Sequence, residues 1–375
     1  MKQSIICVIG TRPEAIKMAP VIKTLRNQGA DFDVKICATG QHGQMLSDVM
    51  DFFNVRTDIT LNVLKPGQSL SELTSRAIEE MGVLFAGERP DWVLLQGDTT
   101  SAFAASYCAF LSGCKIAHVE AGLRTFNKYA PFPEEINRRM IGVVADLHFA
   151  PTPRSVAALR SEGVPESSIY LTGNTIVDAL RDASMILEAK APQLPDDLPL
   201  IDDSTKIVLV TSHRRENHER GLANICNALK KFLTRVPDYQ VLFQVHPNPA
   251  VKSVITSLLT GNKRITLIDP QPYGAFVSLM RRSHFILTDS GGIQEEGPSL
   301  GKPVLVARDN TERPEGIEAG CAELVGTQEE SILEGLMSVA TCNDKYRRMA
   351  SVVNPYGDGT SSAQIAEILR TYLHQ

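Results

Sequence analysis

The feature that most constrains the fold is a series of short apolar runs, rich in β-branched residues, separated by segments of helical length. The first half contains "SIICVIG", "FDVKICATG", "WVLLQGD", "KIAHVEAG", "LHFAP" and "IYLTGN". The second half contains "KIVLVTSH", "QVLFQVHP", "RITLIDP", "HFILTDS" and "KPVLVARD". Continuous apolar runs, rather than strict alternation, are typical of parallel strands that helices cover on both faces. The two series predict an α/β protein with two doubly wound parallel sheets.

The length of 375 residues also favours two domains. We place the hinge near 170–175, which gives a first Rossmann-like domain over residues 1–172 and a second over 173–355. In open parallel sheets, ligands bind at the carboxyl ends of the strands. Two such domains therefore predict an active-site cleft between them.

Two further segments lie outside the strand series. The stretch 191–205 contains three prolines and four aspartates, which predicts a loop before the first strand of the second domain. Residues 363–372 form an amphipathic pattern. We expect this C-terminal helix, within 356–375, to pack back on the first domain.

The charge and the cysteines limit the location and the partners of the protein. A net charge of −5 argues against a nucleic-acid or anionic-membrane surface as the main partner. No apolar stretch reaches the roughly 18 residues of a membrane span. The chain enters a strand at once, so we expect no cleavable signal peptide. The seven cysteines are odd in number and form no CxxC, which predicts buried, reduced thiols in a cytoplasmic protein.

The stretch "VIGTRPEAIK" predicts a strand followed by a helix that begins after Thr11. Thr11 and Glu14 have the spacing of a capping box, and Pro13 suits the first helical turn. A helix N-terminus carries a positive partial charge, yet Arg12 and Lys17 lie at this end. We therefore expect these two cations to face a multiply charged anion.

A second anion site is predicted in "LTDSGGIQEE", where Ser290, Gly291 and Gly292 open a helix after a strand. The alternative is an ordinary turn whose glycines allow tight packing. On that helix, the carboxylates of Glu295 and Glu296 are candidates for receiving ribose hydroxyls, and the alternative for one of the two is a side chain that simply faces solvent. The chain has neither G-x-G-x-x-G after its first strand nor a P-loop, which argues against tightly held NAD and against an ATPase. A diphosphate that bridges the cleft would satisfy both anion sites.

Three carboxylates are candidates for acid–base chemistry. Asp98 in "LLQGDTTS" and Glu120 in "HVEAGLRT" follow neighbouring strands, and Glu134 lies four residues before Arg138 on one helix. Thr99 to Ser101 also suit a helix cap. The Glu134–Arg138 pair alone would indicate a surface ion pair. Together, carboxylates at strand ends perturb one another's pKa, which favours a catalytic group.

Two histidines, His213 and His246, close predicted strands of the second domain beside other polar residues. A packed structural role and a functional one are equally compatible with this placement. The other six histidines have no metal-ligand spacing, and no DxD motif follows a strand. We expect no required metal.

Several ordered motifs give the chain a resemblance to one family. They are "GTRPEAIKMAPV", "GDTTS", "HVEAGLRT", "PFPEEINRRMI", "TSHRREN", "HPNP", "LTDSGGIQEE", "GKPVLV", "TERPEG" and "NPYGDG". In these the chain resembles the bacterial, non-hydrolysing UDP-N-acetylglucosamine 2-epimerases. The resemblance implies the GT-B architecture and the interconversion of UDP-GlcNAc and UDP-ManNAc without NAD. The implied reaction is anti elimination of UDP to 2-acetamidoglucal, followed by re-addition.

The same resemblance assigns roles to residues. The implied catalytic set is Asp98, Glu120, Glu134, His213, Lys17 and Arg138. The residues implied to bind UDP are Arg12, Gln271, Phe276, Ser290, Gly291, Gly292, Glu296 and Arg313. A second UDP-GlcNAc, acting as an allosteric activator, is implied at Gln41, Gln44, Gln68, Glu135, Arg214 and His246. Which carboxylate is the base stays open.

Relatives also imply a homodimer, and ManNAc-containing polysaccharide biosynthesis as the pathway. Three alternatives remain. A hydrolysing epimerase would release ManNAc and UDP from the same fold. A GT-B glycosyltransferase would need an acceptor groove. A nucleotide-sugar-binding regulator without catalysis would not need Asp98, Glu120 and Glu134 together.

Overall fold

The computed structural model describes residues 2–40, 43–65, 67–190, 205–212 and 220–373. The chain divides into two compact units. The first unit consists of residues 1–182 and 356–375, and the second unit of residues 183–355. Helix α7 (Thr175–Ala189) begins in the first unit, so the division falls inside a helix, ten residues beyond the predicted boundary.

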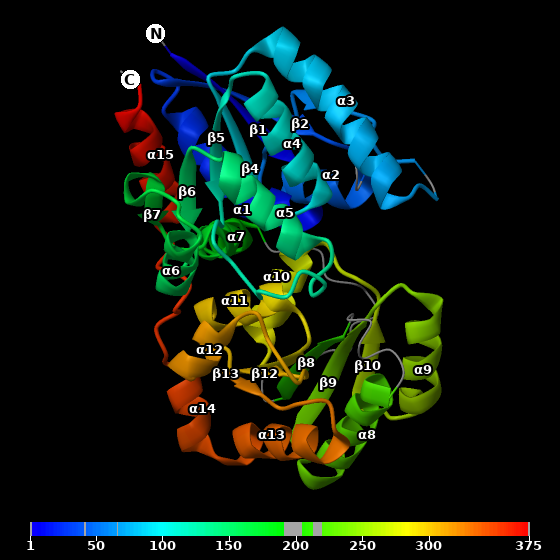
Figure 1. Cartoon of the computed structure of the whole chain (residues 1–375). Coiled ribbons are helices and arrows are strands. Elements are labelled where there is room, and N and C mark those ends of the chain that lie inside the picture. The colour runs from blue at the N-terminus through cyan, green and yellow to red at the C-terminus, as the bar shows by residue number, and fades with distance from the viewer. Residues whose placement is uncertain (1, 41–42, 66, 191–204, 213–219, 374–375) are drawn as a thin grey trace. The chain divides into compact units, whose positions relative to one another are not determined.

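The first unit is built on a seven-stranded sheet in the order β3-β2-β1-β4-β5-β6-β7 (Figure 1). Its strands are β1 (Gln3–Ile9), β2 (Phe32–Ala38), β3 (Ile59–Thr60), β4 (Trp92–Gln96), β5 (Lys115–Val119), β6 (Leu147–Ala150) and β7 (Ile169–Leu171). All pairings are parallel. The apolar runs of the first half therefore form strands as predicted, and the two-residue β3 is an addition.

Helices cover both faces of this sheet. One layer contains α1 (Arg12–Asn27), α2 (Gly43–Phe52) and α15 (Ser361–Thr371), and the other contains α3 (Leu70–Glu88), α4 (Thr100–Leu111) and α5 (Glu134–Val144). The remaining helices are α6 (Pro153–Ser161) and the short η1 (Glu166–Ser168). In Figure 1 the red helix α15 lies among the blue and green elements of the first unit.

The second unit repeats this plan with six parallel strands in the order β10-β9-β8-β11-β12-β13. They are β8 (Lys206–Ser212), β9 (Tyr239–Val245), β10 (Ile265–Ile268), β11 (Phe285–Thr288), β12 (Val304–Val306) and β13 (Ala322–Leu324). One face carries α8 (Arg220–Arg235), α9 (Pro249–Leu259) and α13 (Glu329–Thr341). The other helices are α10 (Tyr273–Arg282), α11 (Gly291–Ser299), α12 (Pro314–Ala319) and α14 (Asn343–Ala350). Both predicted doubly wound sheets are thus confirmed.

Each sheet has its own apolar core. In the second unit, the rings of Phe232, Tyr239 and Phe285 pack edge to face or tilted, with centroids 5.3 to 6.3 Å apart. In the first unit, Met81 and Phe85 of α3 are fully buried against the strands. All seven cysteines are free thiols, and six are buried as expected. Cys342, which the same prediction placed inside, is exposed.

The register of the central strands brings their carboxyl ends level. In the first unit Gln96 of β4 is opposite Val119 of β5, and in the second Thr211 of β8 is opposite Thr288 of β11. Because the strands are parallel, the polar residues that follow them gather along one edge of each sheet. None of the described helices is both long and apolar enough to span a membrane.

Candidate active site

The carboxyl ends of β4 and β5 hold a buried ionic cluster in the first unit. Glu120 follows β5 and is only 7% exposed. Its Oε2 accepts hydrogen bonds from Lys17 Nζ and, at 2.7 Å, from Gln96 Nε2. Glu120 also has a φ of +65°, a left-handed conformation that is uncommon outside glycine. Such backbone strain persists where the surrounding structure enforces it and is found often at functional sites.

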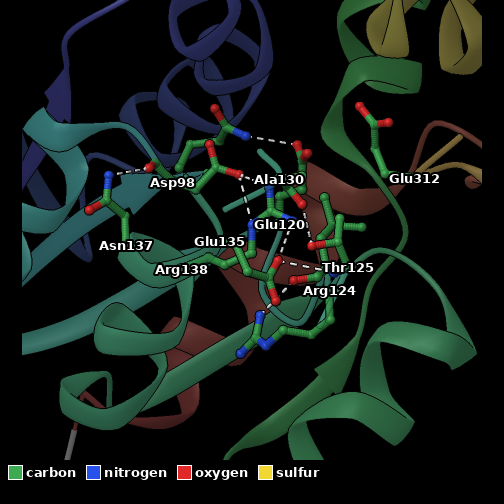
Figure 2. A network of polar contacts seen from close by, with 12 residues as sticks. Asp98, Glu120, Arg124, Thr125, Ala130, Glu135, Asn137, Arg138 and Glu312 are labelled. Carbon is green, nitrogen blue, oxygen red and sulfur yellow. Dashed lines mark hydrogen bonds and ion pairs between the residues drawn. The ribbon is translucent and has the colours of Figure 1, made fainter. Parts of the chain in front are cut away.

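Asp98 lies beside this cluster, in the turn between β4 and α4 (Figure 2). Its Oδ2 accepts two hydrogen bonds from Arg138, at 2.5 Å from Nη2 and 3.0 Å from Nε. Asn137, also on α5, donates to the backbone carbonyl of Asp98 at 2.9 Å. The Asp98 side chain is 23% exposed, so its carboxylate is held but still accessible.

Arg138 does not pair with Glu134. Among the described residues, its carboxylate partners are Asp98 and Glu135, the latter at 3.3 Å in an i,i+3 arrangement. The interaction predicted from the i,i+4 spacing is therefore absent from the described contacts. Glu134 opens α5 and is half-buried.

Glu135 is fully buried and holds the loop that follows β5. Its two carboxylate oxygens accept the backbone N–H groups of Thr125 and Phe126, each at 3.0 Å. Because Arg138 also donates to it, Glu135 links this loop to the Arg138–Asp98 pair (Figure 2). The sequence resemblance had placed this residue at a second ligand site.

Glu14 is a buried carboxylate that the sequence indicated only as a capping residue. The predicted capping box with Thr11 is present, and the Glu14 carboxylate accepts the backbone N–H groups of Gly10 and Thr11. Its other oxygen accepts the hydroxyl of Thr99, the N-cap of α4, at 2.5 Å. Burial raises the pKa of Glu14 to about 7, although these donors favour the charged form.

The cations of "GTRPEAIK" occupy the first turns of α1. Lys17 is buried in its pair with Glu120, whereas Arg12 at the start of the helix is half-buried. The helix start therefore brings positive charge to the edge of the sheet that carries Asp98 and Glu120. The predicted partner of Arg12 and Lys17 is a multiply charged anion, which these contacts do not test; Lys17 pairs with Glu120, a carboxylate of the protein itself.

In the second unit, the ends of β8 and β11 present hydroxyls and the start of a helix. The hydroxyl of Ser212 donates to the buried Asp289 at 2.9 Å, and Thr211 and Thr288 share a hydrogen bond of 2.7 Å. Ser290 is the N-cap of α11, which begins at Gly291 as predicted. When a helix begins with two glycines, no side chains cover its first backbone N–H groups, which can then donate to an anion.

Helix α11 also carries two glutamates that differ in their partners. Glu295 is buried and forms an ion pair with Arg313, the N-cap of α12. Glu296 accepts the hydroxyl of Tyr273 at 3.2 Å. The alternative in which one of the two glutamates faces solvent is wrong, since both residues are at most 7% exposed.

The other predicted residues of the second unit either follow a strand or lie on α10. Gln271 follows β10, where its backbone N–H donates to Gln244 at 3.2 Å and its side chain to the carbonyl of Asp269 at 2.7 Å. Phe276 is 5% exposed on α10. His246 follows β9, and its Nδ1 accepts the backbone N–H of Asn248 at 3.2 Å.

Some predicted residues lie outside the described part of the chain. These are Gln41, His213 and Arg214, as well as most of the predicted 191–205 loop and the side chain of Gln44. Gln68 is described, and its Oε1 accepts Lys65 N–H and Arg76 Nη1 at 2.9 Å each. Within the described ranges no group of three or more His, Cys, Asp or Glu side chains has the arrangement of a metal site.

Comparison with known proteins adds independent findings. The family model described as UDP-N-acetylglucosamine 2-epimerase matches residues 23–370. The UDP-N-acetylglucosamine 2-epimerase of Escherichia coli K12 is 46% identical over 369 residues, which covers 98% of each chain.

Two solved structures extend this likeness to the fold. The UDP-GlcNAc 2-epimerase from Neisseria meningitidis bound to UDP-GlcNAc has a TM-score of 0.93 and 44% identity, covering 98% of this chain and 100% of the other. The Methanocaldococcus jannaschii enzyme in complex with UDP-GlcNAc and UDP has a TM-score of 0.84 and 32% identity, covering 98% and 99%.

Proposed function

This chain belongs to the UDP-N-acetylglucosamine 2-epimerase family, and on that premise we propose that it inverts C2 of UDP-GlcNAc to give UDP-ManNAc, reversibly, without hydrolysis and without NAD. The observation that carries the proposal is a pair of carboxylates at the ends of neighbouring strands. Asp98 is partly exposed and Glu120 is buried. Each is held by a cation, Arg138 or Lys17.

The proposed reaction has two steps. In the first, a carboxylate takes the C2 proton while the C1–O bond breaks, so that UDP leaves with the bonding electrons and 2-acetamidoglucal remains. In the second, an acid protonates C2 on the opposite face while the UDP oxygen re-forms the bond at C1. Carboxylates suit both proton transfers, because a carboxylate accepts a proton and the acid formed can return one. Glu134 and His213 complete the proposed catalytic set.

Departure of UDP requires stabilisation of a developing diphosphate charge. We assign the diphosphate to the start of α11 at Ser290, Gly291 and Gly292, with Arg313 and Arg12 as cations. Glu296 is assigned to the ribose, and Gln271 and Phe276 to the uracil. The buried position of Arg313 supports this assignment, because a guanidinium already fixed by Glu295 needs little ordering to bind phosphate.

A second UDP-GlcNAc is proposed as an activator, bound by Gln41, Gln44, Gln68, Arg214 and His246, with Glu135 shaping the adjoining loop. The M. jannaschii relative, whose complex holds both UDP-GlcNAc and UDP, supports two nucleotide positions. The rate should then rise sigmoidally with UDP-GlcNAc, and pure UDP-ManNAc should react slowly. A hyperbolic curve with fast reverse turnover would count against the activator.

We also propose a cytoplasmic homodimer. The neighbouring helices α3, α4 and α5 expose several large apolar side chains of the kind found in subunit interfaces. They are Val83, Tyr107, Phe110, Leu111, Met140 and Val143. Sedimentation velocity of the wild type and of Phe110→Glu tests this interface. A dimeric wild type and a monomeric variant would support it, whereas the same mass for both proteins would contradict it.

The proposed activity is tested by proton NMR of the protein with UDP-GlcNAc in deuterated water, without NAD or metal. UDP-ManNAc that carries deuterium at C2 supports non-hydrolysing epimerisation. Free ManNAc and UDP would instead assign the hydrolysing reaction. No change would contradict both.

A further inference from the structure

The turn that joins β4 to α4 carries Asp98, and it is held at three consecutive residues. The carbonyl of Gly97 lies 2.7 Å from His118 Nε2, the carbonyl of Asp98 accepts Asn137 Nδ2 at 2.9 Å, and the hydroxyl of Thr99 donates to Glu14 at 2.5 Å. The three holding side chains come from β5, α5 and α1. All are nearly inaccessible to solvent, with exposed fractions of 1%, 5% and 3%.

The chemistry of His118 fixes the direction of its hydrogen bond. A carbonyl oxygen only accepts, so Nε2 must donate and the imidazole is the Nε2–H tautomer. Burial lowers the pKa of His118 to about 3, so the ring is neutral at physiological pH and has one proton to give. Within the described residues, the buried Nδ1 has no hydrogen-bond partner. The single donor of this ring is therefore committed to the Gly97 carbonyl.

Gly97 needs this support because of its backbone. Its φ of +76° is a conformation that glycine adopts readily, and glycine also has the largest conformational freedom to lose. The Gly97 N–H donates to the Val119 carbonyl at 3.1 Å, so β5 and its His118 hold both polar groups of this residue. The next residue is Asp98, whose carboxylate direction depends on the backbone held here.

We propose that His118, with Asn137 and Glu14, is a positioning residue that fixes the backbone of the 97–99 turn and thereby aims the Asp98 carboxylate. The inference rests on the proposed function, in which Asp98 takes part in proton transfer. None of the three side chains has to touch substrate, since each acts through the turn. A displacement of about 1 Å at a reacting group can cost about 10²-fold in rate, which sets the expected effect.

The main test compares two histidines that lie side by side in the sheet. His118 is paired in register with His148 of β6, which is equally buried and also has a lowered pKa, but hydrogen-bonds the backbone of Ala145 instead of the turn. His118→Leu removes the donor to Gly97. His148→Leu removes a similar ring without touching the turn and is the matched control.

We expect His118→Leu to lower kcat about 10²-fold, with KM and UDP affinity within about twofold of the wild type. His118→Gln, whose amide can donate to the same carbonyl, should recover most of kcat. His148→Leu should keep wild-type kcat, even where its thermal stability falls as much as that of His118→Leu. This split separates positioning of Asp98 from general support of the core.

Asn137→Leu provides a second variant should His118→Leu not fold, and it too should lower kcat with UDP affinity retained. The proposal is overturned by wild-type kcat in a folded His118→Leu or Asn137→Leu, by equal kcat losses in His118→Leu and His148→Leu, or by a lack of recovery in folded His118→Gln. Wild-type protein that does not exchange the C2 proton would instead contradict the proposed function, which keeps the two failures distinct.

Discussion

The two units arrange their first six strands in the same order but differ in the residues at the carboxyl ends of the central strands. In the first unit, β4 lies beside β1 and leads to Asp98, which is partly exposed and held by Arg138. In the second unit, β11 takes the same position beside β8 and leads to Asp289, which is fully buried and accepts the hydroxyl of Ser212. An aspartate that follows the strand at this place in the sheet is thus partly exposed in one unit and buried within the framework in the other.

This difference shows that the two units carry different chemical groups at the same edge of a similar sheet. Both sheets present strand ends and helix starts along one edge, as parallel topology dictates. The first unit fills that edge with carboxylates and cations, whereas the second fills it with hydroxyls, glycines and backbone N–H donors. We therefore infer that the first unit supplies the carboxylates for proton transfer and that the second unit supplies most of the contacts to the diphosphate.

The strongest test of this division is Asp98→Asn. We expect kcat to fall about 10²–10⁴-fold, because an amide cannot transfer a proton, while UDP affinity stays unchanged. Isotope exchange at C2 and UDP titration calorimetry measure the two quantities. Asp33→Asn, at an exposed position of β2, is the control and should behave as wild type. Unchanged turnover in Asp98→Asn would remove this residue from the mechanism.

A second test compares the backbones of the two units at Gly122, in the loop after β5, and at Gly297, inside α11. A Cβ at Gly122 would lie 2.3 Å from the carbonyl oxygen of Ser155, and φ is +89°, so Gly122→Ala should cost about 2–5 kcal/mol. At Gly297 a Cβ would lie 2.4 Å from Cγ2 of the buried Val304, but this glycine has ordinary helical backbone and alanine favours the helix. Gly297→Ala should therefore cost about 1–2 kcal/mol.

The two glycine effects can be observed separately. Trp92, the single tryptophan, lies in β4, so its fluorescence reports unfolding of the first unit. Urea titration should show the loss from Gly122→Ala in Trp92 fluorescence and the loss from Gly297→Ala in far-UV circular dichroism. A larger loss from Gly297→Ala would contradict the distinction between a clash that adds left-handed backbone strain and a clash within an ordinary helix.

Arg313→Ala tests the second unit directly. Loss of a charge-assisted contact should weaken UDP binding about 10–100-fold, and it should also lower stability because the buried Glu295 loses its cation. Calorimetric titration with UDP measures the affinity. Arg281→Ala, which breaks a largely exposed pair with Glu188, is the matched control. Wild-type UDP affinity in Arg313→Ala would show that Arg313 does not bind the nucleotide.

The smallest expected effect is one that the two units share. Burial lowers the pKa of His148 in the first unit and of His284 in the second to about 4, from an ordinary value of 6.5. Between pH 6.5 and 4 the unfolded chain therefore binds protons that the folded chain does not, so stability falls as the pH falls. Each group contributes at most about 1.4 kcal/mol per pH unit.

His148→Leu and His284→Leu should each flatten this acid dependence, the first in Trp92 fluorescence and the second in circular dichroism. The change in the free energy of unfolding that each substitution causes should be the same at pH 7 and at pH 8. At both pH values the histidine rings are neutral in the folded and in the unfolded chain. An unchanged slope below pH 6.5 would mean that the ring removed is protonated in the folded state.

Much of this arrangement was predictable from the sequence because it depends on local pattern. The apolar runs located the longer strands, and the capping signals at Thr11 and Thr99 located two helix starts. Strand β3 has only two residues and β13 has Glu323 at its centre, so neither forms a continuous apolar run. Their existence depends on neighbouring strands already being in place.

The site was predictable only as far as strand ends could be found. Asp98 and Glu120 follow apolar runs and could be expected to lie near each other. The partners that hold them could not: which of Glu134 and Glu135 turns inward depends on the loop packed against α5, and the burial of Glu14 depends on Thr99 from a distant helix. Such contacts between segments far apart in the chain leave no spacing signature.

Because it contains helix α15, the first unit is completed later in synthesis than the second. Tyr372 packs edge to face on Trp92 at 5.8 Å and its carbonyl accepts Gln3 Nε2, so the first unit joins the earliest and the latest described segments of the chain. Synthesis runs from the N-terminus, and all of residues 183–355 leave the ribosome before α15 does. The second unit can therefore close its sheet while the first still lacks a covering helix. A premature stop near residue 355 would leave the later-made unit intact and the earlier-made one exposed to proteases.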